Sequence, residues 1–175
     1  EIIKKINQEE TIIYAYIGRL VKEKGIHLLL ESFALQKDSN KLLLIDSFDK
    51  EDKYIKFLKN LLIKYDLINR IIFFNSDHCS INLIYNICDF VVLPSISNDK
   101  WKEQYGRVPV EASFCKVFTI LGNSGHLVDL PISKYIFDSK KDLPPLNHSK
   151  KFIYSSKMLS TKEMAKDINL ILNSI

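Results

Sequence analysis

The chain of 175 residues has the size of one ordinary domain, with 46% hydrophobic residues, 26% charged residues and a formal net charge of +4. This apolar content excludes a chain that is disordered as a whole, because it can offset the entropy lost on folding. No apolar run approaches the roughly 20 residues that span a bilayer, and residues 1–10 carry no signal-peptide pattern. We expect a cytoplasmic domain with at most peripheral membrane association, at the inner face.

The positive charges and the cysteines do not point to nucleic acid or to metal. Lysines stand beside acids, as in residues 50–53, whereas nucleic-acid-binding proteins usually gather their positive charge into a stripe. A solvated surface is therefore favoured over a nucleic-acid interface. Cys79, Cys88 and Cys115 have neither C-x-x-C nor Cys/His metal spacing, so neither a disulfide framework nor a zinc site is predicted. Cys88 and Cys115 are expected to be small buried apolar side chains.

The first half of the chain alternates between two patterns. Residues 12–17 form an apolar run that ends at Gly18, which indicates a buried strand. From Ile26 to Ala34 the apolar residues recur at the spacing of one helical face. The alternation continues with a strand at 42–45, a helix at 55–65 and a strand at 71–74.

The second half continues the same alternation. It predicts a helix at 81–87, a strand at 90–93, a helix at 108–114, and strands at 117–121 and 132–137. Residues 141–160 form a turn-rich connection, and Ser160 with Glu163 has the spacing of a capping box that starts a helix over 161–175.

This alternation predicts an α/β fold for the whole chain. Apolar strands between amphipathic helices indicate a parallel sheet with helices on both faces. Right-handed crossovers then favour a doubly wound, Rossmann-like topology in a single domain, with its core at about residues 11–140. The pattern does not determine the order of the strands.

The loop after the first strand is a candidate ligand site, because ligands of open α/β sheets bind beyond the carboxyl ends of the strands. Arg19 and Lys24 lie in this loop, just before a predicted helix whose free amides favour an anion. The loop matches neither the dinucleotide fingerprint nor the P-loop. These residues alone leave both an anion site and a solvated loop open.

The segment after the fourth strand is the second candidate. Pro109 is tolerated in the first turn of a helix, which places the helix start near Gly106. Gly106 would also let a ligand approach the backbone closely. Glu111 then lies about one turn inside the helix and Glu103 lies in the loop before it. In a chain with 21 acidic residues this glutamate pair is weak evidence by itself.

Four motifs in order carry a family resemblance. They are Gly18-Arg19-Leu20, Glu23-Lys24-Gly25, Pro94-Ser95, and the segment from Glu103 to Ala112. Together, over roughly residues 12–129, they resemble the C-terminal, nucleotide-sugar-binding domain of the group 1 (family 4) glycosyltransferases, with their GT-B fold and E-x7-E motif.

The resemblance implies an activity for the whole enzyme. A sugar would pass from a nucleotide-diphosphate sugar to a glycan, lipid or protein acceptor, with retention of configuration and without a metal or other cofactor. Polysaccharide or lipopolysaccharide biosynthesis is the implied context. The N-terminal acceptor-binding domain of the family has no counterpart in this chain, so the isolated domain is expected to be inactive.

The resemblance also implies roles for individual residues. Arg19 and Lys24 match the basic pair on the donor diphosphate, and Glu103 matches the glutamate placed against the sugar; these three are the expected catalytic residues. Glu111 matches the acceptor of the ribose hydroxyls. Further donor contacts are expected from Gly18, Asn75, Ser76, Tyr105, Gly106, Arg107, Val108 and, because it follows a strand end, His126. No metal ligand is expected.

Two other functions are alternatives to this one. A catalytically inactive nucleotide-sugar-binding or regulatory module would have the same pocket and lack only the partner domain. A Rossmann-like oxidoreductase is disfavoured, because the glycine fingerprint and the acidic residue about 20 positions beyond it are missing. For Trp101, packing is favoured over stacking on a base.

Overall fold

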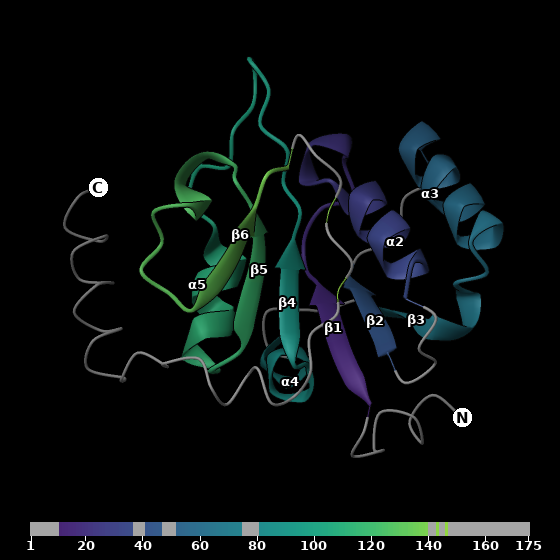
Figure 1. Cartoon of the computed structure of the whole chain (residues 1–175), viewed down its shortest axis with the longest axis horizontal. Coiled ribbons are helices and arrows are strands. Elements are labelled where there is room, and N and C mark those ends of the chain that lie inside the picture. The colour runs from purple at the N-terminus through teal and green to yellow at the C-terminus, as the bar shows by residue number, and fades with distance from the viewer. Residues whose placement is uncertain are drawn as a thin grey trace.

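The computed structural model describes residues 11–36, 41–46, 52–74 and 81–139, with Leu143 and Leu146. In this part of the chain six parallel strands form one sheet in the order β3-β2-β1-β4-β5-β6 (Figure 1). They are β1 (Ile12–Tyr16), β2 (Lys41–Asp46), β3 (Ile71–Phe74), β4 (Phe90–Leu93), β5 (Phe118–Gly122) and β6 (Lys134–Phe137). The chain reverses its direction of winding between β1 and β4, so the predicted doubly wound class is confirmed.

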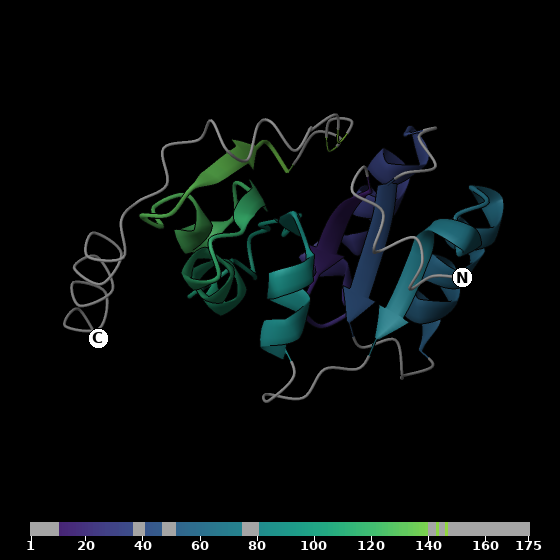
Figure 2. The same ribbon diagram turned by 90° about the horizontal axis from the view of Figure 1, so that it is seen from below.

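Helices cover both faces of this sheet (Figures 1 and 2). The α-helices are α2 (Ile26–Ala34), α3 (Lys53–Lys64), α4 (Ile81–Ile87) and α5 (Arg107–Phe114), and the short 3-10 helices are η1 (Lys22–Lys24), η2 (Ile68–Arg70) and η3 (Gly125–Leu127). None of the described helices is long and apolar enough to cross a membrane.

Strand β1 shows how the two layers are built. Successive side chains of a strand point to opposite faces. Tyr14 and Tyr16 therefore enter the core that α2 and α3 cover, and Ile13 and Ala15 enter the core shared with α4 and α5. The Tyr14 ring stacks on Phe90 of β4 at 5.1 Å between centroids. With β4, which is buried along its whole length, β1 forms the centre of the sheet.

The structure refines the predicted boundaries by one or two residues. Helix α3 begins at Lys53 because Asp52 caps it, with its Oδ1 accepting from the Ile55 amide at 2.8 Å. Turn η1 lies in the loop after β1, where no helix was predicted. Apart from Leu143 and Leu146, both in the core, the connection at 141–160 and the helix at 161–175 lie outside the described residues.

Candidate functional site

The candidate site lies where the loops after β1 and β4 meet, at the point where the strand order reverses. The Ile96 amide donates to the Glu23 carbonyl at 2.8 Å, which joins the two loops. Gly25, at φ 68°, is packed so tightly that a Cβ would stand 1.9 Å from the Pro94 carbonyl oxygen. The loops therefore form one continuous wall around a hollow.

This hollow, the switch-point pocket, has a volume of about 520 Å³. That size is ordinary for a small-molecule site. Five cationic side chains and one carboxylate are among the residues that line it: Ile17, Gly18, Arg19, Lys24, Leu93, Lys100, Trp101, Lys102, Glu103, Gln104, Tyr105, Gly106, Arg107 and Val108. The charge balance of this lining favours an anionic ligand.

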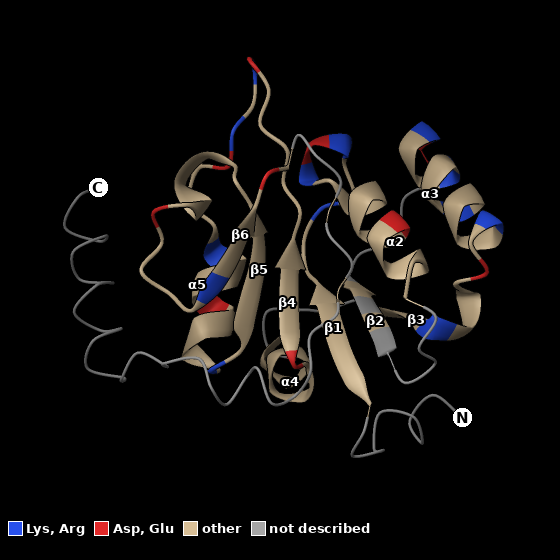
Figure 3. Cartoon of the chain, viewed as in Figure 1, with Lys and Arg blue, Asp and Glu red and all other residues tan. Residues whose placement is uncertain are grey.

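Figure 3 shows the same charges on the whole domain. The described strands carry few charged residues. Lys and Arg lie on η1 and on the loop that projects beyond β4, and also along α3, and acidic residues lie among them at η1 and on the loop. The tip of that loop is a tight turn, in which Asn98 pairs with Trp101 through two backbone hydrogen bonds.

Lys24 and Glu103 form an ion pair inside the pocket. The Lys24 Nζ lies 2.5 Å from Glu103 Oε2, and the side chains are only 15% and 12% exposed. The buried Ser95 hydroxyl donates to the same oxygen at 3.0 Å, and the ammonium lies 5.4 Å from the Trp101 ring centroid. Glu103 is therefore fixed through Oε2 by two donors from two different loops.

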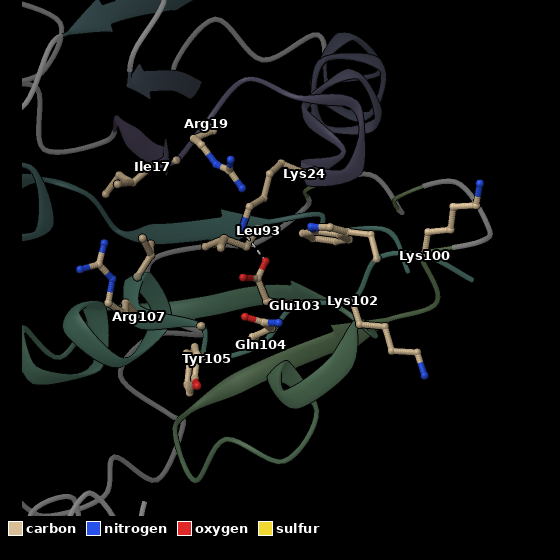
Figure 4. Close-up of a pocket in the computed structure, with 14 residues that line it drawn as sticks. Ile17, Arg19, Lys24, Leu93, Lys100, Lys102, Glu103, Gln104, Tyr105 and Arg107 are labelled. Atoms are coloured by element: carbon tan, nitrogen blue, oxygen red, sulfur yellow. Dashed lines mark hydrogen bonds and ion pairs between the residues drawn. The ribbon is translucent and has the colours of Figure 1, made fainter. Parts of the chain in front are cut away.

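The other cations are arranged around this pair (Figure 4). Arg19 extends from the loop after β1 toward the space beside Lys24 and Glu103, whereas Lys100 and Lys102 point away from it. Among the described residues, the exposed Arg19 guanidinium has no hydrogen-bond or ion-pair partner. Its donors are therefore available to a ligand.

Helix α5 begins at the pocket. Gly106 is its N-cap residue, in the left-handed conformation at φ 60°, and Pro109 lies in the first turn, as predicted. Amides in the first turn of a helix have no partner within the helix, and the helix dipole adds partial positive charge there. Because Arg107 and Val108 also line the pocket, their backbone can face an anion.

Glu111 is placed differently from the other candidates. It lies one turn farther along α5 and is not in the lining of the pocket. Its Oε2 accepts a hydrogen bond from the Tyr85 hydroxyl of α4 at 2.8 Å. The pocket thus brings together Arg19, Lys24 and Glu103. Glu111 lies beside the pocket, on the helix α5 whose first residues line it.

A second hollow of about 450 Å³ adjoins Glu103 and Tyr105 and includes His126. The His126 amide donates to the Glu103 carbonyl at 3.2 Å, and Gly125, at φ 52°, packs against the same backbone. His126 is thus close to the backbone of Glu103 but lies outside the switch-point pocket. Asn75 and Ser76 lie outside the described residues.

The sequence interpretation missed Tyr85 and the contact made by Ser95. Ser95 had one signal, its place in the Pro-Ser motif, whereas Tyr85 looked like an ordinary helical residue. Cys88 is buried, and burial with the nearby Asp89 raises the pKa of its thiol to about 12. Cys115 is half-buried, and its pKa is raised by burial and by Glu111. Both therefore remain thiols. The predicted burial is confirmed for Cys88, whereas Cys115, which follows the end of α5, is only half-buried.

A family model for glycosyl transferases group 1 matches residues 1–173. The chain belongs to this family. Among curated relatives, the capsular polysaccharide biosynthesis glycosyltransferase CapM of Staphylococcus aureus is 30% identical over 135 residues, which are 71% of this chain and 31% of CapM. The chain therefore spans less than a third of the length of this relative.

Solved structures of glycosyltransferases share the fold. A glycosyltransferase from Rickettsia africae matches 95% of this chain and 45% of its own, at TM-score 0.73 and 22% identity. HepE of Anabaena, in complex with UDP and glucose, matches 99% of this chain and 51% of its own, at TM-score 0.66 and 18% identity. The C-terminal domain of LpcC, a group 1 protein of Francisella tularensis, matches 93% of this chain and 85% of its own, at TM-score 0.61 and 21% identity.

Proposed function

We propose that this chain is the donor-binding domain of a glycosyltransferase and holds a nucleotide-diphosphate sugar in the switch-point pocket. The observation that carries this proposal is the meeting of Arg19, Lys24 and the start of α5 around one hollow. A diphosphate carries the charge and the many acceptor oxygens that such cations and helix amides satisfy. Membership of the family, and the UDP bound to HepE, support this ligand class.

In this proposal the cations assist the departure of the diphosphate. As the bond between the sugar and the diphosphate breaks, negative charge grows on the leaving oxygen, and Arg19 and Lys24 stabilise it. Because cationic side chains and helix amides supply this stabilisation, the transfer needs no metal. Glu103, fixed by Lys24 and Ser95, contacts the sugar, and Glu111 accepts from the ribose hydroxyls. The configuration of the sugar is retained.

The acceptor is a glycan or glycolipid, and an N-terminal acceptor-binding domain closes the other side of the cleft. Relatedness to CapM supports a role in polysaccharide biosynthesis. The chain's own residues then hold the donor, and transfer depends on the partner domain.

The phosphate assignment is tested by removing both cations. Arg19→Ala combined with Lys24→Ala should weaken the binding of UDP by about 100-fold or more, since each charge-assisted hydrogen bond contributes about 1.5–3 kcal/mol. Binding of uridine should change far less. Calorimetry measures both ligands, with GDP/guanosine and ADP/adenosine as alternative pairs.

A matched control removes two exposed lysines of α3, Lys53→Ala with Lys56→Ala, and so lowers the net charge equally. It should leave UDP binding close to that of the wild type. Equal losses for UDP and uridine in the Arg19/Lys24 variant would contradict the phosphate role.

A further inference from the structure

The contact between Tyr85 and Glu111 joins two helices on the same face of the sheet. Tyr85 is 2% exposed, within the core cluster that also contains Ala112 of α5. Its hydroxyl is the one polar atom that this ring brings into an otherwise apolar layer. A buried tyrosine hydroxyl usually needs a partner, and here the partner is a carboxylate oxygen at 2.8 Å.

The direction of this hydrogen bond is fixed by charge. Burial and the adjacent Glu111 carboxylate raise the pKa of Tyr85 far above its ordinary value. The phenol therefore keeps its proton at every physiological pH and donates it, while the carboxylate accepts. The bond orients Glu111 as well as satisfying Tyr85, because it fixes one of the two carboxylate oxygens in place.

The position of Glu111 connects this bond to the pocket. Residues three and four apart lie on one helix face, so Glu111 follows Val108 and Arg107, which line the pocket, by one turn. Glu111 is half-buried, and within the described part of the chain Tyr85 is its one hydrogen-bond donor from a side chain. With Oε2 engaged, Oε1 remains to accept from a ligand.

We propose that Tyr85 is a positioning residue, whose hydroxyl holds Oε2 of Glu111 so that Oε1 meets the ribose hydroxyls of the donor nucleotide. This inference rests on the proposed function, because it needs Glu111 to bind the ribose. Tyr85 itself touches no ligand; it acts through the carboxylate. Its effect should therefore depend on the presence of ribose hydroxyls.

The test compares ligands that differ only in those hydroxyls. Whichever of UDP, GDP and ADP binds the chain most tightly is titrated beside its 2′,3′-dideoxy form. Tyr85→Phe keeps the ring and should weaken binding of the ribonucleotide by about five- to tenfold, the range of one lost hydrogen bond. Binding of the dideoxy form should stay within about twofold of the wild type. In the Glu111→Ala background, Tyr85→Phe should add no further loss.

Tyr14→Phe is the matched control. Tyr14 is also a buried tyrosine, and its hydroxyl donates to the Leu146 carbonyl at 2.9 Å in the opposite layer. This variant removes one buried hydroxyl without touching Glu111, so the preference for the ribonucleotide should not change. Equal losses for both ligands in Tyr85→Phe, or a loss that persists in the Glu111→Ala background, would overturn the positioning role.

Failure of the inference can be separated from failure of the proposed function. If Glu111→Ala abolishes the ribose preference and Tyr85→Phe leaves it intact, the positioning role is wrong and the ribose site stands. If the wild type shows no ribose preference, or binds no nucleotide, both the positioning role of Tyr85 and the ribose site at Glu111 are wrong. Should Tyr85→Phe fail to fold, 3-fluorotyrosine at position 85 keeps the hydroxyl. Its fluorine resonance should shift with the ribonucleotide and not with the dideoxy form; a resonance unmoved by either ligand would overturn the inference.

Discussion

Lys24 and Glu103 show how two residues 79 positions apart can act as one unit. Lys24 comes from η1 and Glu103 from the segment before α5, and both side chains are largely buried. Screening by salt is weak for such a pair, and removing one partner leaves the other charge partly buried and uncompensated. The pair therefore contributes to the junction of the two loops as well as to the pocket.

This coupling predicts a non-additive pattern of stability. Lys24→Met should lower the free energy of unfolding by about 2–3 kcal/mol, and Glu103→Leu by a similar amount, because each leaves one charged side chain without its partner. The double variant should lose less than the sum by at least about 1 kcal/mol. Urea denaturation of the four proteins measures the coupling. Lys22→Met, an exposed lysine in the same turn, serves as the control; additive losses at Lys24 and Glu103 would contradict the coupling.

At the scale of single residues, the sequence suggested the members of the site but not their contacts. Arg19, Lys24 and Glu103 were identified by motif, and the structure brings all three to one pocket. Their functional roles stay predictions. The Ser95 hydroxyl on Glu103 could not be foreseen, because it depends on how the loop after β4 folds back over eight residues.

At the scale of elements, each of the two loops contains a glycine in the left-handed backbone conformation. Gly25 and Gly106 have φ of 68° and 60°, so alanine would meet similar backbone strain at both positions. The surroundings differ. A Cβ at Gly25 would collide with the Pro94 backbone, whereas at Gly106 it would meet the end of the Leu127 side chain at 2.6 Å.

Gly25→Ala should therefore destabilise the chain more than Gly106→Ala. We expect about 1–2 kcal/mol for Gly106→Ala from backbone strain, with some adjustment of Leu127, and at least about 1 kcal/mol more for Gly25→Ala. The Pro94 carbonyl cannot move without separating the loops. Chemical denaturation compares the two variants. Equal losses of unfolding free energy would contradict this prediction, because they would mean that the Pro94 backbone can move away from position 25 at little cost.

Helices α2 and α3 are joined by a histidine that links stability to pH. His27 Nδ1 lies 2.7 Å from the Tyr54 hydroxyl. Burial raises the pKa of Tyr54, so the phenol keeps its proton and forms a neutral hydrogen bond with the imidazole. Burial, and secondarily Lys22, lowers the pKa of His27 below its ordinary value of 6.5. The native state therefore favours neutral His27.

It follows that acid should weaken this junction. Below pH 6.5 the unfolded chain binds a proton at position 27 before the folded chain does, so stability rises with pH across this range. The contribution is complete above pH 6.5 and is lost as the pH falls toward the lower pKa of the folded state, with a slope of at most about 1.4 kcal/mol per pH unit. His27→Gln should flatten the fall in unfolding free energy between pH 6.5 and 5. The unfolding free energy of both proteins is measured by chemical denaturation at each pH. An equal fall between pH 6.5 and 5 in the two proteins would refute this prediction.

The elements themselves were predictable because their patterns are local. The alternation of apolar runs and helical spacing located every strand and α-helix of the described residues to within two residues. The strand order was not predictable, since several orders satisfy right-handed crossovers equally well. The order was nevertheless decisive, because only adjacent β1 and β4 bring the two candidate loops together.

At the scale of the whole molecule, the reversal of strand order explains why the site is where it is. Helix α2 follows β1 and covers one face, whereas α5 follows β4 and covers the other. The loops that lead into them meet above the sheet, and the hollow lies beside this junction. Glu111 lies one turn into α5, beside the residues of that helix that line the pocket, and its contact with a ligand there stays a prediction.

A ligand that binds this hollow only in the folded chain must raise the melting temperature. At a concentration of 100 times Kd, the added stability is about 2.7 kcal/mol, which for a domain of this size corresponds to an increase of about 5–11 °C. UDP, GDP and ADP are each compared with their nucleosides in a thermal denaturation series. The diphosphate that fits should stabilise the chain, while its nucleoside does so much less.

The same series decides whether a metal takes part in donor binding. No group of three or more His, Cys, Asp or Glu residues that could hold a metal ion is found among residues 11–36, 41–46, 52–74 and 81–139. The proposed function has Arg19, Lys24 and the amides of α5 neutralise the diphosphate directly. The increase in melting temperature should therefore be the same with EDTA as with added Mg²⁺. An increase that EDTA abolishes would show that the cations of the pocket are insufficient, and the metal-free mechanism would have to be abandoned even if the nucleotide site stands.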